Sequence, residues 1–213
     1  MDFIPDLGPI LAFTLAAFVL TITPGPDMTL FLGRTLSGGR AAGIAAMLGA
    51  ASGVLVHTTL AALGLSALIA ASPEAFAVLR IAGAAYLLYL AVQAIRTGSS
   101  FQLDAKGGAP ERSLFSHWLT GVGINLLNPK IILFFVTFLP SFVSAGDPHA
   151  AGKLAFFGVY FIALAVPMSI AMILAADRFA AALKRRPKIM RGIDYLFASV
   201  FSAFAVSIFL ART

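Results

Sequence analysis

Two opposite charges, Asp27 and Lys130, stand inside long apolar stretches of this chain. A lone aspartate or lysine deep in a membrane-spanning helix costs about 2.5 to 3.5 kcal/mol to insert, so such groups face a cavity or pair with one another. Charges at that depth typically bind a substrate or an ion. We therefore expect Asp27 and Lys130 to approach each other, directly or through water or a ligand. The alternative is a permanent ion pair that only locks two helices together.

Each of these charges follows a motif that interrupts a helix. Thr23-Pro24-Gly25-Pro26 precedes Asp27, and Asn125-Leu126-Leu127-Asn128-Pro129 precedes Lys130. Proline removes a backbone donor and glycine adds backbone freedom, so both helices should break. In lipid, a break is tolerated only where the freed carbonyls face protein or a water-filled cavity. The predicted binding residues are therefore Thr23, Pro24, Gly25, Pro26, Asp27, Asn125, Asn128, Pro129 and Lys130.

An amino-acid zwitterion would complement such a site. Its ammonium group could meet Asp27 and the freed carbonyls, and its carboxylate could meet Lys130 or Asn128. His57 could relay protons, because histidine titrates near neutral pH. A neutral His57 that is hydrogen-bonded inside the protein is the alternative.

The composition indicates the elements that must position these residues. Of 213 residues, 60% are hydrophobic, about 128, and 11% are charged, against roughly 25% charged in soluble domains. Six membrane-spanning helices of about 20 residues each would need about 120 hydrophobic residues. An ordinary soluble enzyme and a disordered chain are excluded. The six apolar runs cover residues 7–33, 41–71, 75–95, 114–143, 154–176 and 192–211.

The basic residues between these runs predict the orientation. Eleven of them follow runs one, three and five, and two follow runs two, four and six. Because retained loops carry the positive charge, both termini should lie outside the cytoplasm. The net charge of +6 then reflects cytoplasmic loops rather than nucleic-acid binding. The eleven are Arg34, Arg40, Arg96, Lys106, Arg112, Arg178, Lys184, Arg185, Arg186, Lys188 and Arg191; the two are Lys153 and Arg212.

The two broken runs also indicate an internal repeat. Setting Pro26 against Pro129, an offset of 103 residues, aligns Leu30 with Leu133 and Phe31 with Phe134. Three helices per repeat is an odd number, so the second copy would be inverted, an arrangement found in many transporters. We expect an all-α integral membrane protein with six transmembrane helices in two inverted three-helix repeats, helices 1 and 4 being broken. Residues 1–213 form a single transporter domain: repeat 1 covers about 1–97, a cytoplasmic linker 98–112 and repeat 2 113–213.

Other functional classes find little support in the sequence. The chain has no cysteine, and its three histidines, His57, His117 and His149, lie in separate regions, so we expect no metal site and no cofactor. No H-E-x-x-H or G-x-S-x-G motif occurs, so we expect no enzyme. The repeat and the buried charges favour a secondary transporter. A passive channel or facilitator for small zwitterions is the alternative.

Three motifs resemble the LysE/RhtB family of amino-acid exporters. They are Thr23-Pro24-Gly25-Pro26-Asp27, the stretch Gly83-Ala84-Ala85-Tyr86-Leu87-Leu88-Tyr89-Leu90, and Asn128-Pro129-Lys130 followed by Leu133-Phe134-Phe135. The resemblance implies a multi-pass protein of the bacterial inner membrane that exports amino acids or their derivatives with the proton gradient. It implies amino acid, proton and lipid bilayer as partners and allows a homodimer. The last run departs from the family because residues 198–203 contain no glycine.

Overall fold

The structure is a computed structural model that describes residues 4–97, 113–144, 147–176, 178 and 187–210. All its regular elements over these residues are helical. The predicted linker, 98–112, lies outside them, as do Lys106, Arg112, Lys184, Arg185, Arg186 and Arg212. The long helices are α1 (Leu7–Ile22), α2 (Pro26–Leu60), α4 (Pro73–Thr97), α5 (Leu114–Leu126), α7 (Ala150–Leu174) and α9 (Pro187–Leu210). The short ones are η1 (Ala61–Leu65), α3 (Ser66–Ala71), α6 (Pro129–Leu133), η2 (Phe134–Phe138) and η3 (Leu139–Phe142).

Both predicted helix breaks are present. Helix α1 ends at Ile22, the backbone is extended at Thr23 and Gly25, and α2 begins at Pro26. Helix α5 ends at Leu126, and α6 begins at Pro129; the helical segment Pro129–Phe142 is turned by 52° relative to α5. In each case the second helix begins with a proline, whose fixed φ suits the first helical position and whose missing N–H is not needed there. The prolines therefore end one helix and start the next.

Helix α2 reverses direction at Gly39, which has a positive φ of 82°. A Cβ on Gly43 would lie 3.1 Å from the carbonyl oxygen of Phe31, although residues so far apart in a straight helix are separated by about 18 Å. Residues 26–38 therefore form a short arm that folds back on a long arm, residues 40–60. The sequence had placed a polar break at 34–40. The helix continues through most of it, because one glycine in the left-handed region suffices for the reversal.

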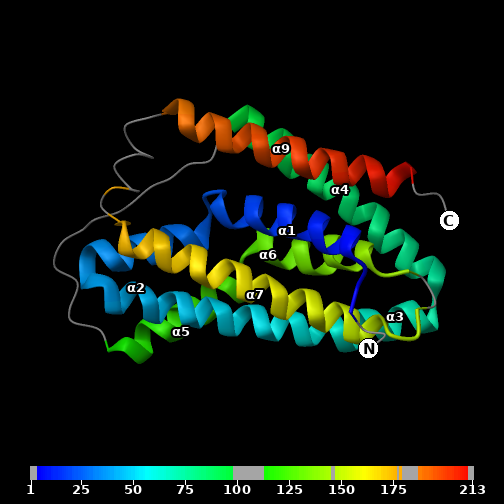
Figure 1. Cartoon of the computed structure of the whole chain (residues 1–213), viewed down its shortest axis with the longest axis horizontal. Helices are drawn as coiled ribbons and strands as arrows, with labels where there is room; N and C mark the ends of the chain where they lie inside the picture. The colour runs from blue at the N-terminus through cyan, green and yellow to red at the C-terminus, as the bar shows by residue number, and fades with distance from the viewer. Residues whose placement is uncertain (1–3, 98–112, 145–146, 177, 179–186, 211–213) are drawn as a thin grey trace.

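The helices form two groups (Figure 1). The long arm of α2 packs along α5 and α7, whereas α4 and α9 pair with each other. A Cβ on Gly49 would clash with the carbonyl of Trp118, and one on Gly121 would clash with that of Ala46. The backbones of α2 and α5 thus lie in contact, a close approach that small residues permit.

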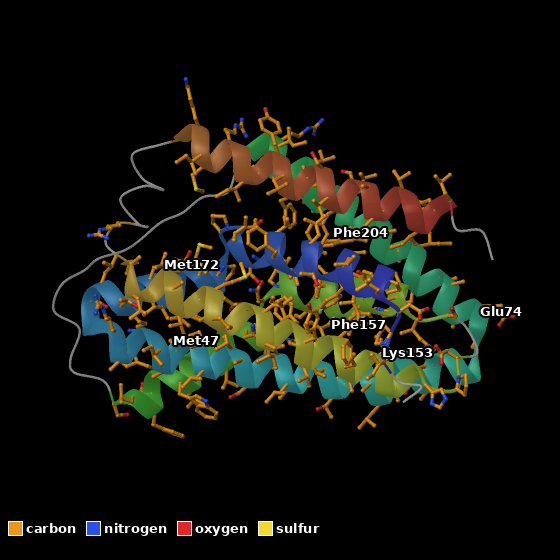
Figure 2. All side chains as sticks on the ribbon, in the orientation of Figure 1. Met47, Glu74, Lys153, Phe157, Met172 and Phe204 are labelled. Carbon is orange, nitrogen blue, oxygen red and sulfur yellow. The ribbon has the colours of Figure 1, made fainter. Side chains whose placement is uncertain are left out.

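Phenylalanines join the two groups. Phe13, Phe134, Phe138, Phe157 and Phe201 are fully buried. The Phe138 ring lies 5.6 Å from that of Phe201 and 4.6 Å from that of Phe204, which connects η2 to α9. Figure 2 shows Phe157 and Phe204 in this layer, on α7 and α9 respectively. The aromatic core thus fixes α9 against the segment that follows the second break.

The helices show a multi-pass membrane protein. Four helical stretches in the described residues are long and apolar enough to cross a bilayer, and the bent pair of α5 with residues 129–142 makes up to five. Helix α1, at 16 residues, is shorter. The start of α1 and the end of α9 lie at the same end of the protein (Figure 1). Six spans and an inverted repeat remain predictions.

Two helices begin earlier than the sequence predicted. Helix α7 starts at Ala150 and α9 at Pro187, so Lys153, Lys188 and Arg191 lie in helices rather than in loops. Long basic side chains can reach polar partners from a helix end. Lys153 pairs with Asp147, and Arg191 donates a hydrogen bond of 2.7 Å to the carbonyl of Ile95.

Candidate functional site

A cavity of about 70 Å³ lies between α1, both arms of α2, α5, α6 and α7. Its polar lining includes Thr23, Asp27, Asn125 and Lys130, four of the nine residues predicted from the sequence. The two breaks, about a hundred residues apart in the chain, therefore meet at one place. The cavity is large enough for a few water molecules.

Asp27 lies in the first turn of α2. Its Oδ2 atom accepts hydrogen bonds from the side-chain amides of Asn125, at 3.0 Å, and Asn128, at 3.1 Å. Its Oδ1 atom is buried and has no hydrogen-bond partner among the described residues. One carboxylate oxygen is thus held by the protein and the other is left for a ligand or water.

Lys130 binds the end of α1 rather than Asp27. Its Nζ donates to the carbonyl oxygens of Leu20, at 3.1 Å, and Thr23, at 2.9 Å. These are carbonyls that the end of α1 leaves without an intrahelical partner, and the partial negative charge of a helix C-terminus favours a cation there. No ion pair within 4.0 Å joins Lys130 to Asp27 in the part of the chain described, although both line the cavity.

Asn128, Gly25 and the three prolines shape the breaks without lining the cavity, and Thr23 contributes to both. Asn128 is 1% exposed; its Oδ1 accepts from the backbone N–H of Lys130, which caps α6, and its amide binds Asp27. A Cβ on Gly25 would lie 3.1 Å from the Nζ of Lys130, so the glycine admits the ammonium. The Thr23 hydroxyl donates to the carbonyl oxygen of Val19, and the Thr23 carbonyl oxygen accepts a hydrogen bond from Lys130. Pro24, Pro26 and Pro129 interrupt or start helices.

His57 supports the site from outside the cavity lining. Its Nε2 lies 3.4 Å from the carbonyl oxygen of Asn125, and its ring centre lies 5.7 Å from that of Phe135. This contact holds the carbonyl end of α5. His57, His117 and His149 lie on different elements, and the described residues contain no cluster of three His, Asp or Glu side chains suited to a metal ion.

Gly53 lies against the candidate site, although it is not among the nine residues predicted from the sequence. A Cβ at this position would lie 2.6 Å from the Oδ1 of Asn125. That Oδ1 atom is also buried without a hydrogen-bond partner in the described residues. The signal was present in the spacing, because Gly49, Gly53 and His57 follow one another at four-residue intervals along one helix face.

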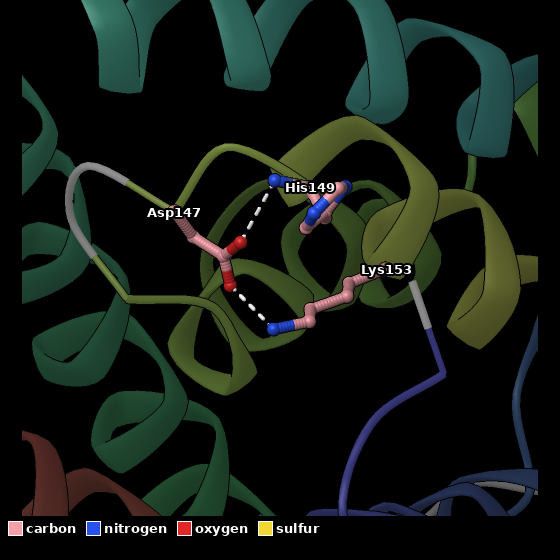
Figure 3. Close-up of polar contacts among 3 residues, drawn as sticks. All are labelled: Asp147, His149 and Lys153. Carbon is pink, nitrogen blue, oxygen red and sulfur yellow. Dashed lines mark hydrogen bonds and ion pairs between the residues drawn. The ribbon is translucent and has the colours of Figure 1, made fainter. Parts of the chain in front are cut away.

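A second polar cluster lies around the start of α7, away from the cavity lining (Figure 3). The Asp147 carboxylate accepts hydrogen bonds from the Lys153 ammonium, at 2.6 Å, and from the backbone N–H of His149, at 2.8 Å. The bond from Lys153, followed by that from His149, lowers the pKa of Asp147 below its ordinary value of 3.8. This aspartate–lysine pair is separate from the cavity.

Comparison with known proteins identifies the family. Residues 18–212 match the family model described as LysE type translocator. The chain belongs to this family. A homoserine/homoserine lactone efflux protein of Salmonella typhimurium is 30% identical over 191 residues, covering 89% of this chain and 90% of the relative. A LysE-type translocator is a transporter and not an enzyme.

Two further relatives carry no assigned substrate. The uncharacterized membrane protein YrhP of Bacillus subtilis is 39% identical over 142 residues, covering 63% of this chain and 68% of the relative. An uncharacterized membrane protein of Vibrio cholerae is 30% identical over 196 residues, covering 92% of this chain and 94% of the relative. No solved structure matches this translocator.

Proposed function

We propose that this translocator is a secondary active exporter of amino acids or their derivatives, working as a proton antiporter. The observation that carries the proposal is a pair of buried acceptors without partners, Oδ1 of Asp27 and Oδ1 of Asn125, in the same cavity lining as the Lys130 ammonium. Buried acceptors that lack a partner are costly, so a donor should occupy this place when the site is filled. An ammonium group supplies three donors.

The same cavity offers a partner for a carboxylate. Lys130 uses two of its three N–H donors on Leu20 and Thr23, which leaves one for a ligand. An amino-acid zwitterion placed with its ammonium at Asp27 and its carboxylate at Lys130 would satisfy both charges. The efflux of homoserine by a relative of the same length supports this substrate class.

Proton coupling follows from competition at Asp27. The free carboxylate oxygen can hold either a proton or a substrate ammonium, but not both. A proton arriving from outside would displace the substrate, and a substrate arriving from the cytoplasm would displace the proton. This exclusion is sufficient for exchange if the two broken helices move between inward-facing and outward-facing arrangements. A passive channel would move substrate without moving protons.

The proposed setting is the bacterial inner membrane. The connections that carry most of the lysine and arginine residues would face the cytoplasm, and both termini would lie outside it. The unequal distribution of basic residues between the two sides predicts this orientation. The homodimer also remains a prediction, which mass measurement of the purified protein in nanodiscs would test.

Transport in proteoliposomes tests the function. Homoserine counterflow and the pH of the vesicle interior are followed together for the native chain, Asp27→Asn and Lys130→Met. Loss of a hydrogen bond to a charged group costs about 1.5 to 3 kcal/mol, so each variant should lose at least about tenfold in transport. Asp147→Asn and Lys153→Met make the same chemical changes in the pair outside the cavity and should retain native transport.

The outcomes separate the alternatives. Substrate movement without proton movement would show a passive facilitator. Native rates in both Asp27→Asn and Lys130→Met would overturn the assignment of the site. Equal losses in Asp147→Asn and Lys153→Met would show that the measurement reports folding rather than binding.

A further inference from the structure

The cavity contains a hydroxyl that the proposed transport mechanism does not use. Ser169 on α7 lines the cavity and is 5% exposed. Among the described residues its side chain has no hydrogen-bond partner. The Oγ atom of Ser169 is not fully enclosed by the protein, so a group bound in the cavity can form a hydrogen bond with it.

The free hydroxyl of Ser169 sets it apart from the other buried serine and threonine side chains of the described residues, which all donate to a backbone carbonyl. Serine and threonine inside helices commonly donate to the carbonyl four residues earlier. Eleven described side chains make this bond, ten within helices and Thr23 at the end of α1: Thr14, Thr21, Thr23, Thr35, Ser37, Ser52, Thr58, Thr59, Ser66, Thr120 and Thr137. Ser169 makes no such bond to Ala165, although both lie in α7. Its hydroxyl is therefore available to the cavity.

The surroundings of Ser169 are apolar. On α7 the cavity is lined by Ser169 and five apolar residues on the same helix face: Phe161, Ile162, Ala165, Val166 and Met172. Met47 on α2 lines the same cavity, and Figure 2 shows Met47 and Met172 toward the same end of the protein. Methionine side chains adapt to the shape of a ligand. Ser169 thus offers one hydrogen-bonding group on an otherwise apolar side of the cavity. It lies on a different helix from Asp27 and Lys130.

We propose that Ser169 determines specificity by binding a polar side chain of the transported amino acid. The inference rests on the proposed function, in which Asp27 and Lys130 hold the ammonium and carboxylate. The substrate side chain would lie along the apolar wall, with its terminal hydroxyl or carbonyl at the Ser169 hydroxyl, which can both donate and accept. The protein would therefore prefer short amino acids with a polar end over aliphatic ones of similar size.

A matched pair of substrates tests this preference. Homoserine and 2-aminobutyrate differ only in the terminal hydroxyl. Binding of each to the purified protein in nanodiscs and transport of each in proteoliposomes are measured for the native chain, Ser169→Ala and Ser169→Thr. One neutral hydrogen bond accounts for about a 3- to 10-fold preference, so Ser169→Ala should lose that factor for homoserine and keep 2-aminobutyrate unchanged. Ser169→Thr retains a hydroxyl and should restore at least part of the preference.

Thr58→Val is the control for removing a buried hydroxyl. Thr58 is also 5% exposed, but it does not line the cavity and it donates to Val54 at 2.8 Å. This variant should keep the native preference. Thermal unfolding of each variant shows whether it is folded.

Other results would overturn either the role of Ser169 or the proposed function. Native discrimination in Ser169→Ala, or equal losses for both substrates, would overturn the role of Ser169. If the native chain bound and transported the two substrates equally well, the role of Ser169 would also be overturned. The proposal of amino-acid export would stand in that case. Failure of the native chain to bind or move either amino acid would overturn the proposed function together with the inference.

Discussion

The side-chain amide of Asn125 donates a hydrogen bond of 3.0 Å to Oδ2 of Asp27, joining the last turn of α5 to the first turn of α2. Asn125 is itself held by the long arm of α2: Gly53 leaves room for its side chain and His57 contacts its carbonyl. The carboxylate that we propose as the exchange site, which lies on the short arm of α2, therefore depends on the packing of α5 against the long arm of α2.

Replacement of Gly53 should impair transport through Asn125. In Gly53→Ala the new methyl group would lie 2.6 Å from the Oδ1 of Asn125, so the amide must move and its bond to Asp27 must lengthen. Loss of one hydrogen bond to a carboxylate predicts about a tenfold or greater fall in homoserine transport. Counterflow in proteoliposomes measures it.

Gly123→Ala is the matched control for this change. Gly123 lies on α5 two residues before Asn125, and a Cβ there would have nothing within 4 Å. The variant should transport at the native rate and should unfold at the same temperature or slightly higher, since alanine favours helix. If Gly53→Ala behaved in the same way, contact with Asn125 would not govern the site.

Replacement of His57 should distinguish a structural role of this residue from a role as a proton relay. His57 contacts the Asn125 carbonyl and is not part of the cavity lining, so we expect a structural role. A glutamine can donate to the same carbonyl but does not titrate. His57→Gln should therefore keep the number of protons moved per substrate, with a rate within about threefold of native, the effect of losing part of one neutral hydrogen bond. Uncoupled movement of substrate in this variant would instead assign His57 as a proton relay.

The Asp147–Lys153 pair should stabilise the protein only above acidic pH. Because the bonds from Lys153 and His149 depress the pKa of Asp147, the stabilisation is present above 3.8 and is lost as pH falls through the lower value in the folded protein. The thermal midpoint of Asp147→Asn should lie about 2 °C or less below that of the native protein near pH 7. This gap should narrow as the pH falls below 3.8; a gap that does not narrow would mean that the carboxylate charge is not its source.

The absence of cysteine from the chain makes orientation directly measurable. Ser37→Cys lies beside the Gly39 reversal, and Pro148→Cys lies beside Asp147; both positions are exposed. A membrane-impermeant maleimide added to intact cells should label Pro148→Cys and leave Ser37→Cys unlabelled until the membrane is opened. The opposite pattern would reverse the predicted topology.

The sequence predicted the helix breaks well because they depend on local chemistry. Proline and glycine act on their own backbone, so Thr23-Pro24-Gly25-Pro26 and Asn128-Pro129 could be interpreted without knowledge of their neighbours. The meeting of the two breaks in one cavity also followed, from the cost of burying Asp27 and Lys130 singly.

The partners of those charges depended on tertiary packing and could not be predicted. Lys130 binds the carbonyls of Leu20 and Thr23 because Gly25 admits its ammonium. The free hydroxyl of Ser169 was also missed, because a helical serine ordinarily bonds to its own backbone. Its place two residues after Pro167, in an otherwise apolar run, was the available signal.

In the predicted topology the reversal at Gly39 lies at the membrane surface, and the short arm of α2 would then set the depth of Asp27 in the membrane. Eleven residues of helix separate Asp27 from Gly38, a length of about 17 Å, close to half of the roughly 30 Å hydrocarbon thickness. One residue inserted in this arm would move the carboxylate by about 1.5 Å and rotate it by about 100° away from Asn125. The length of the short arm is therefore as much a determinant of the site as the identity of its charged residue, and it should tolerate substitution more readily than insertion or deletion.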